Sequence, residues 1–484
     1  MRHFSSVLFF IGVACCASAQ TFVEAQLLGQ RTAAELIAET GVPFIQYDAK
    51  YYRLQYMTTD AQGQPVLASG LLAAPVSSHG GTIYPRLVYQ HGTSSSKLDV
   101  PSFNVLQGGE GTIGLIFAGL GYVSFLPDYV GLGVSPGFHP YVHAATEASC
   151  ALDMMRACVD FCADKGIYYN EQLFITGYSQ GGHAAMALHR AIEQMDGAEF
   201  GEVTAAAHLS GPYSISGAMR DLILSDSVYF YPGYLPNTAL SYQTVYGNLY
   251  DQLDEVFKEP YAGMIAQFYA GQINLGQLNG RLIDSLTAYE GASIPTRMLQ
   301  SAMIDAVGSD PDHPINVALR DNDVYAWSPQ SPTRIYYCMA DDQVPFRNSL
   351  IARDTMLALG AQDLVVQDLN PTANHGECVV PALTATVFFF ASFQNITTIG
   401  VSEPGRPFTV RASPNPVRDR LWIETPSDQD AQLWLYDAHG RLAYGVERCR
   451  GLCEISVGGL AAGVYFLLAQ SGEYQVLERV QVAR

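Results

Sequence analysis

The chain has 484 residues, enough for two or three domains of roughly 100–200 residues each. Apolar residues make up 48% of it and charged residues 15%, a composition that can bury a large core and excludes an extended disordered protein. With 26 basic and 46 acidic residues the net charge is −20, so the chain repels phosphate backbones and we expect no nucleic-acid partner. No apolar run reaches the roughly 18–20 residues that a transmembrane helix needs, so we expect no transmembrane segment.

Residues 1–19 are typical of a secretory signal peptide. Arg2 supplies the positive start, the apolar run 7–16 is too short to span a membrane, and residues 17–19 are small, as a cleavage site requires. The alternative is that this segment is a buried first helix. A signal peptide predicts that the mature chain begins near Gln20 and is exported from the cytoplasm through the periplasm.

Nine cysteines are present, and Cys15 and Cys16 would leave with the signal peptide. Seven remain, an odd number that leaves at least one free thiol. Three of them share one predicted helix, where they could equally be small buried apolar residues: Cys150, Cys158 and Cys162. Two pairs could form disulfides, Cys338 with Cys378 and Cys449 with Cys453. No cluster has the spacing of zinc ligands, so we predict no metal site.

Residues 396–407 are rich in glycine and proline and have no apolar periodicity, so we predict a linker there. The segment 408–484 contains short strand-like runs separated by turn signals, which predicts a small all-β domain of the sandwich type. It holds 8 basic and 9 acidic residues, so the strong acidity belongs to the preceding body. This difference favours two independent modules.

The C-terminal module also carries three motifs: residues 413–416 (SPNP), 436–442 (YDAHGRL) and 459–467 (GLAAGVYFL). Together they resemble the C-terminal sorting domain of the bacterial type IX secretion system. The resemblance implies that this secretion machinery is a partner and that the protein is secreted or attached to the outer cell surface, often after cleavage of the domain. The last residues, 478–484, are less basic than is usual in this family. The alternative is an ordinary β-sandwich that binds another ligand.

In the body, residues 20–395, predicted strands alternate with helices. The strands are predicted at 51–57, 66–73, 86–90, 122–126, 173–176, 205–209, 334–338 and 364–369, and the helices at 144–162, from about Gln180, at 348–359 and at 381–393. The alternation predicts an α/β fold with a mostly parallel sheet covered on both faces. Residues 214–323 contain no convincing strand and many aromatic residues, which we interpret as an inserted helical cap. Most of these aromatic side chains would pack the cap's own core, and a few could line an apolar substrate pocket.

A strand at 173–176 leads directly into the sequence G-x-S-x-G, with Ser179 at its centre. In the context of strand, sharp turn and helix, this motif predicts a nucleophile elbow. The turn puts the serine in a strained conformation and brings Gly177 and Gly181 too close for side chains. It also aims the start of the helix, at Gln180, toward the hydroxyl.

A serine needs a general base, and in this fold the chain order is serine, acid, histidine. Of the histidines, only His375 and His439 follow the later strands, and His439 lies in the C-terminal domain, so we predict His375 as the base. The acid should follow the preceding strand, where Asp341 and Asp342 are neighbours. The sequence D-x-x-V-P favours Asp341, and Asp342 is the alternative. The acid would orient the histidine and stabilise its protonated form.

A developing oxyanion needs at least two backbone donors. We predict the N–H of Gln180 as one donor and the N–H of Thr93, in the loop after strand 86–90, as the other. His91 and Gly92 would shape this loop, since His91 lies on the wrong side of the chain order for a base. Other polar residues near the motifs are interpreted as structural: Asp128, His139, His143, Glu147, His183 and His189.

With these motifs in place, the body resembles α/β-hydrolases, and most of all the secretory lipase family of yeasts and bacteria. The matching pieces are residues 91–93, 121–135, 177–183, 327–329, 341–345 and 375–376, spread over about 45–393. The family implies an α/β-hydrolase sheet with an inserted helical cap, no cofactor, and hydrolysis of carboxylic esters, often of acyl lipids. A departure lies at residues 337–339, where many relatives carry a different strand end. The alternatives are a serine peptidase on the same fold and a surface adhesin without catalysis.

Overall fold

The computed structural model of the chain describes residues 21–77, 81–106, 108–195, 199–398, 409–427, 429–437, 442–471 and 474–483. The predicted signal peptide and His439 therefore lie outside the described residues, as does most of the predicted linker. Across the described ranges, no helix is both long enough and apolar enough to cross a bilayer.

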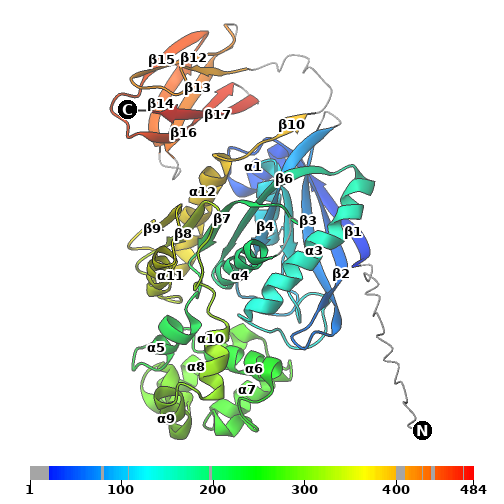
Figure 1. Cartoon of the computed structure of the whole chain (residues 1–484), viewed down its shortest axis with the longest axis vertical. Coiled ribbons are helices and arrows are strands. Elements are labelled where there is room, and N and C mark those ends of the chain that lie inside the picture. Colours follow the sequence, from blue (N-terminus) through cyan, green and yellow to red (C-terminus); the bar gives the residue numbers. More distant parts are fainter. Residues whose placement is uncertain are drawn as a thin grey trace, which may run out of the picture.

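Ten strands of the described body form one mixed sheet (Figure 1). They are β1 (Phe22–Arg31), β2 (Asp48–Thr59), β3 (Pro65–Val76), β4 (Thr82–Gln90), β5 (Val123–Pro127), β6 (Tyr168–Tyr178), β7 (Val203–Leu209), β8 (Thr333–Tyr337), β9 (Leu364–Asp368) and β10 (Thr397–Thr398). The order is β1-β2-β3-β5-β4-β6-β7-β8-β9, and β10 pairs with β4. Strands β1 to β3 pair antiparallel, and from β5 to β9 neighbouring strands run parallel.

Helices cover both faces of this sheet, as the alternation of strands and helices predicts. Helices α1 (Ala33–Thr40), α2 (Gly111–Gly119) and α12 (His375–Ala391) pack on one face. Helices α3 (Ala144–Lys165), α4 (Gln180–Gln194) and α11 (Arg347–Ala358) pack on the other. The three cysteines of α3 are free and buried, and Cys150, Cys158 and Cys162 act as small apolar residues in its contact with the sheet.

The last helix of the body begins six residues before the predicted start. We expected it near 381–393, but α12 begins at His375 and contains Pro381 in its interior. Its start is fixed by a capping box in which Asn374 and Glu377 bond each other's backbone N–H groups. The capping box therefore provides acceptors for backbone N–H groups at the start of the helix, and Pro381 is not needed to begin it.

Residues 214–323 are helical, as predicted for the cap. Their elements are η1 (Ile215–Met219), α5 (Arg220–Ile223), α6 (Tyr234–Tyr246), η2 (Leu253–Glu255), α7 (Tyr261–Tyr269), α8 (Leu275–Glu290), η3 (Pro295–Met298), α9 (Ser301–Ser309) and α10 (Pro314–Asp321). They gather at one end of the sheet (Figure 1). Phe257, Tyr261 and Ile265 are buried with leucines of α8 in a core of the cap's own. The aromatic side chains of Phe257 and Tyr261 therefore serve packing.

The C-terminal segment consists of two antiparallel sheets at the other end of the molecule (Figure 1). One contains β11 (Arg411–Ser413), β12 (Arg420–Glu424) and β15 (Leu452–Ser456), and the other contains β14 (Leu442–Cys449), β13 (Ala431–Asp437), β16 (Gly463–Ser471) and β17 (Tyr474–Val482). Their inward side chains share one apolar core. The predicted all-β class is confirmed. Aromatic rings join this segment to the body, where Phe388 of α12 lies 5.8 Å from the Tyr436 ring and 5.4 Å from the Phe466 ring.

Candidate active site

Ser179 stands between the end of β6 and the first residue of α4, and its backbone has φ 60° and ψ −122°. This left-handed region is strained for a residue with a side chain. The Ser179 N–H donates to the carbonyl of Leu209 at 2.9 Å, which holds the turn against β7. A Cβ on Gly177 would overlap the carbonyl oxygen of Gly181, and a Cβ on Gly181 would overlap that of Gln90. Both glycines are therefore required by backbone contacts, as the motif predicts.

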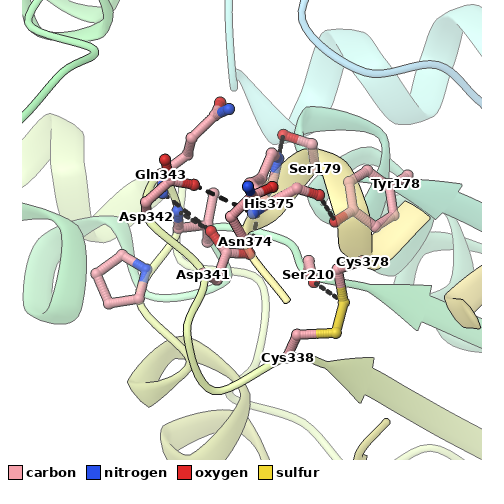
Figure 2. A network of polar contacts seen from close by, with 12 residues as sticks. Tyr178, Ser179, Ser210, Cys338, Asp341, Asp342, Gln343, Asn374, His375 and Cys378 are labelled. Atoms are coloured by element: carbon pink, nitrogen blue, oxygen red, sulfur yellow. Dashed lines mark hydrogen bonds and ion pairs between the residues drawn. A yellow bond between two sulfur atoms is a disulfide. The ribbon is translucent and has the colours of Figure 1, made fainter. Parts of the chain in front are cut away.

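Three predicted side chains meet at the carboxyl ends of the parallel strands (Figure 2). His375 Nε2 lies 2.9 Å from Ser179 Oγ, and His375 Nδ1 lies 2.7 Å from Asp341 Oδ2. The other oxygen of Asp341 accepts the N–H groups of Gln343 at 3.0 Å and Val344 at 2.8 Å. The side chains of His375 and Asp341 are only 7% and 1% exposed, so this relay is shielded from water.

The neighbouring carboxylate, Asp342, has a different partner. It is exposed, and its Oδ1 accepts the backbone N–H of His375 at 3.1 Å rather than a ring nitrogen. The hydroxyl of Tyr178 donates to the carbonyl of His375 at 2.5 Å, so the backbone of the histidine is held from both sides. Of the two candidate acids, the geometry brings Asp341 to the ring.

The structure contains both disulfides that the sequence left open. One joins Cys338, directly after β8, to Cys378 in the first turn of α12. The other joins Cys449 and Cys453 in the C-terminal segment. The first bond lies beside the relay (Figure 2).

Two backbone N–H groups near Ser179 are free to receive a ligand. Gln180 is the first residue of α4, and Thr93 follows β4, which is the neighbour of β6. Within the described residues, neither N–H donates a hydrogen bond to a protein acceptor. The Thr93 side chain is fixed by its hydroxyl, which lies 2.9 Å from that of Tyr141.

The loop that carries Thr93 is held by Glu110, a residue that the sequence analysis did not identify. Both carboxylate oxygens of Glu110 accept the N–H of Gly92 at 3.0 Å, and one also accepts the Tyr89 hydroxyl at 2.7 Å. Burial raises the pKa of Glu110. No local motif marks this residue, because its partners Tyr89 and Gly92 lie 21 and 18 residues earlier in the chain.

His91 supports the same loop from within. Its ring is buried, stacks on Tyr129 with 4.1 Å between ring centres, and faces the carbonyl groups of Gly92 and Asp128. Desolvation lowers the pKa of His91 to about 4, so the ring is neutral at pH 7. These contacts agree with the predicted role of shaping the loop.

An apolar cavity of about 130 Å³ adjoins Ser179 and extends under the cap. Its walls include Ile215, Met219, Leu235, Ala239 and Leu319, with Arg220 as a charged exception. Three of the cap's aromatic residues also line it: Tyr234, Tyr242 and Tyr250. The sequence analysis expected such a division between aromatics that pack the core and aromatics that face a pocket.

Comparison with known proteins agrees with this architecture at both ends of the chain. Residues 412–483 match the family described as the secretion system C-terminal sorting domain. A sequence comparison with curated proteins gives no match.

Among solved structures, the chain is similar to a ligand-bound form of the rice cell wall degrading esterase LipA from Xanthomonas oryzae. The two are 26% identical with a TM-score of 0.67, over 75% of this chain and 94% of the esterase. It is also similar to a candidate hydrolase from Legionella pneumophila, at 24% identity and a TM-score of 0.67, over 77% and 98% of the two chains. Candida antarctica lipase A in its closed state is 16% identical with a TM-score of 0.57, over 77% and 81%.

The body has the fold of esterase and lipase hydrolases. Residues 412–483 of the C-terminal segment match the sorting-domain family. The predicted fold class and both family resemblances are confirmed, and the similarities support ester hydrolase activity and export.

Proposed function

We propose that this protein is an exported serine hydrolase that cleaves carboxylic esters of apolar acyl groups. The observation that carries the proposal is the continuous relay from Ser179 Oγ to His375 and Asp341, with distances of 2.9 and 2.7 Å. Ser179 is the nucleophile, His375 the general base, and Asp341 the group that orients the imidazole and stabilises its protonated form.

In the first step, His375 Nε2 takes the proton of Ser179 as the oxygen attacks the ester carbonyl. The carbonyl π electrons move to the oxygen, and the N–H groups of Gln180 and Thr93 donate to the oxyanion. The tetrahedral intermediate then collapses, and the alcohol leaves with the proton from His375. Water, deprotonated by the same histidine, attacks the acyl-enzyme and releases the carboxylic acid and free Ser179.

The cavity supports an acyl lipid or a related ester as the substrate. It adjoins Ser179, is walled almost entirely by apolar side chains, and leads under the cap, so an acyl chain bound there loses its contact with water. The esterase and lipase activities of the similar structures agree with this substrate class.

We assign residues 1–19 to a signal peptide, 20–395 to the hydrolase domain with its cap at about 214–323, 396–407 to a linker, and 408–484 to the sorting domain. The match at residues 412–483 supports delivery through the type IX secretion machinery. The protein would pass through the periplasm and be released or stay attached to the outer surface.

Nitrophenyl esters of increasing chain length test the proposal, with Ser179→Ala as the control. We expect hydrolysis by the wild type and a loss of at least about 10³-fold in the variant. A fluorophosphonate should label the wild type and not the variant. Equal activity in both proteins would refute the assignment, and turnover of peptide anilides without ester cleavage would favour a peptidase.

A further inference from the structure

A buried acidic residue lies directly behind the nucleophile elbow. Glu147 is in the first turn of α3, and its side chain is only 1% exposed. Its Oε2 lies 2.7 Å from Nδ1 of His183, a fully buried residue of α4, and its Oε1 accepts the side-chain amide of Gln180 at 2.9 Å. A buried carboxylate needs such partners, since an uncompensated charge is costly in the interior.

His183 holds this carboxylate in place through its ring. Its Nε2 lies 2.9 Å from the backbone oxygen of Asn322, so both ring nitrogens face acceptors. Asn322 directly follows α10, the last helix of the cap, so the pair also ties the cap to the elbow helix.

The side chain of Gln180 is held on its second hydrogen as well. Its Nε2 lies 2.8 Å from Nε2 of His139, and Nδ1 of His139 lies 2.8 Å from the carbonyl of Val130. Desolvation lowers the pKa of His139 to about 3, so its ring is neutral, donates from Nδ1 and accepts at Nε2. Both amide hydrogens of Gln180 are therefore used, one by Glu147 and one by His139.

Gln180 is also the residue whose backbone N–H we assign to the oxyanion. We propose that Glu147, held by the His183 ring, is a positioning residue that fixes the Gln180 backbone N–H for the oxyanion. The inference rests on the proposed ester hydrolysis, and it deepens the assignment of that donor. Glu147 touches neither the substrate nor the reacting atoms, and it acts through the side chain of Gln180.

The effect should appear in the transition state rather than in substrate binding. An oxyanion donor must lie within about 2.7–3.1 Å of the developing charge, and the loss of one donor costs about 10²–10³-fold in kcat. Displacement of a donor should cost less than its loss. We therefore expect kcat and the affinity for a boronic acid, which forms a tetrahedral adduct on serine, to fall together while KM changes little.

A charge exchange tests this directly. Q180E places a second carboxylate against Glu147 and should lower kcat about 100-fold. E147Q keeps a hydrogen-bond acceptor for the Gln180 amide but removes the negative charge, and it should lower kcat about tenfold. The double variant E147Q/Q180E restores one carboxylate and one amide. It should recover part of the kcat and of the boronic acid affinity that Q180E loses, although His139 Nε2 still faces a carboxylate. A general loss of stability would not produce this recovery.

The matched control is Glu193→Gln, at the C-terminal end of α4, the helix that begins with Gln180. Glu193 is part-buried at the end of α4, its carboxylate lies 2.9 Å from Nε2 of His189, and it does not touch the elbow. E193Q should lower the melting temperature and leave the boronic acid affinity unchanged.

If the losses of kcat in E147Q and Q180E simply multiply in the double variant, with no recovery, the inference would be overturned. If Q180E does not fold, E147Q alone decides, because unchanged kcat and boronic acid affinity would also overturn it. A wild type that hydrolyses no ester would instead refute the proposed function, which separates the two failures.

Discussion

Cys338 and Cys378 form a disulfide with 6.0 Å between their Cα atoms, and each lies three residues from a member of the relay. Cys338 precedes Asp341 by three residues, and Cys378 follows His375 by three. The bond therefore links the loop after β8, which carries the acid, to the first turn of α12, which carries the base. Both sulfurs belong to the buried core, so the link is protected from solvent.

Removal of this bond should weaken both folding and catalysis. The 40-residue separation predicts that replacing both cysteines by alanine lowers the free energy of unfolding by about 4 kcal/mol on the chain-entropy account. The acid and base would lose their covalent alignment, so kcat should fall about tenfold. Urea unfolding and ester kinetics measure the two effects.

The matched control is the C449A/C453A pair in the sorting domain. That bond spans four residues and lies far from the relay in the chain, so kcat should not change. Wild-type kcat and wild-type stability in C338A/C378A would contradict the prediction.

The two adjacent carboxylates should differ sharply on mutation. Asp341→Asn leaves His375 Nδ1 without its anionic partner and should lower kcat by about 10³–10⁴-fold with little change in KM. Asp342→Asn keeps an oxygen that can accept the His375 backbone N–H, so kcat should stay within about threefold. Similar losses in both variants would mean that the acid is shared.

The sequence was sufficient for the relay because each of its members follows a strand in a fixed order. Ser179 has a motif that only a sharp turn explains, and His375 is the histidine after the last strand of the body. The sequence D-x-x-V-P favoured Asp341 over its neighbour Asp342, and the side-chain directions bring Asp341 to the ring. The supports of the oxyanion loop and elbow, Glu110 and Glu147, could not be found this way, because a carboxylate acquires its partners only when distant segments meet.

Secondary structure was predictable where the periodicity was strong. The central parallel strands were located correctly, but β1, α1 and α2 were missed. The burial of β1 is irregular because it forms the edge of the sheet, and α2 is rich in glycine. In the C-terminal domain the strand-like runs lie at 421–423, 432–436, 464–468 and 475–482, so β11, β14 and β15 were missed. Polar residues interrupt β14 and β15.

The same glycine-to-alanine change should have opposite effects at two positions. In Gly181→Ala, the new Cβ would overlap backbone atoms of Gln90 and His91, so the elbow must shift and activity should be lost with several kcal/mol of stability. Gly280 lies on the exposed side of α8, where a Cβ meets nothing within 4 Å. Gly280→Ala should therefore raise the free energy of unfolding by about 0.5–1 kcal/mol. Thermal unfolding distinguishes them, and a stable, active G181A would contradict the steric account.

Acid should destabilise the protein through its buried histidines. The folded-state pKa of His91 is about 4, against about 6.5 in an unfolded chain, so between these values the unfolded state binds more protons. Stability is therefore fully present above about pH 6.5 and falls by up to about 1.4 kcal/mol per pH unit for this group as the pH drops toward 4. Urea unfolding at several pH values gives the free energy of unfolding against pH. Between about pH 4 and 6.5 its slope should be smaller in His91→Gln than in the wild type. Identical slopes would exclude this contribution.

Filling the apolar cavity should shorten the acyl chain that the enzyme accepts. Ala239 lies on α6 and lines the cavity, so Ala239→Phe would occupy much of its volume of about 130 Å³. Each excluded methylene should lose about 0.8 kcal/mol of binding, or about fourfold in kcat/KM. Octanoate and longer esters should therefore become poor substrates, while acetate keeps its rate.

The matched control is Ala266→Phe on the exposed side of α7, which should leave the chain-length profile unchanged. If Ala239→Phe lowered kcat/KM equally for acetate and for long esters, the substitution would act on the relay or the fold, and the cavity would not be the acyl site. A selective loss of long substrates requires the acyl chain to extend from Ser179 into the space under the cap.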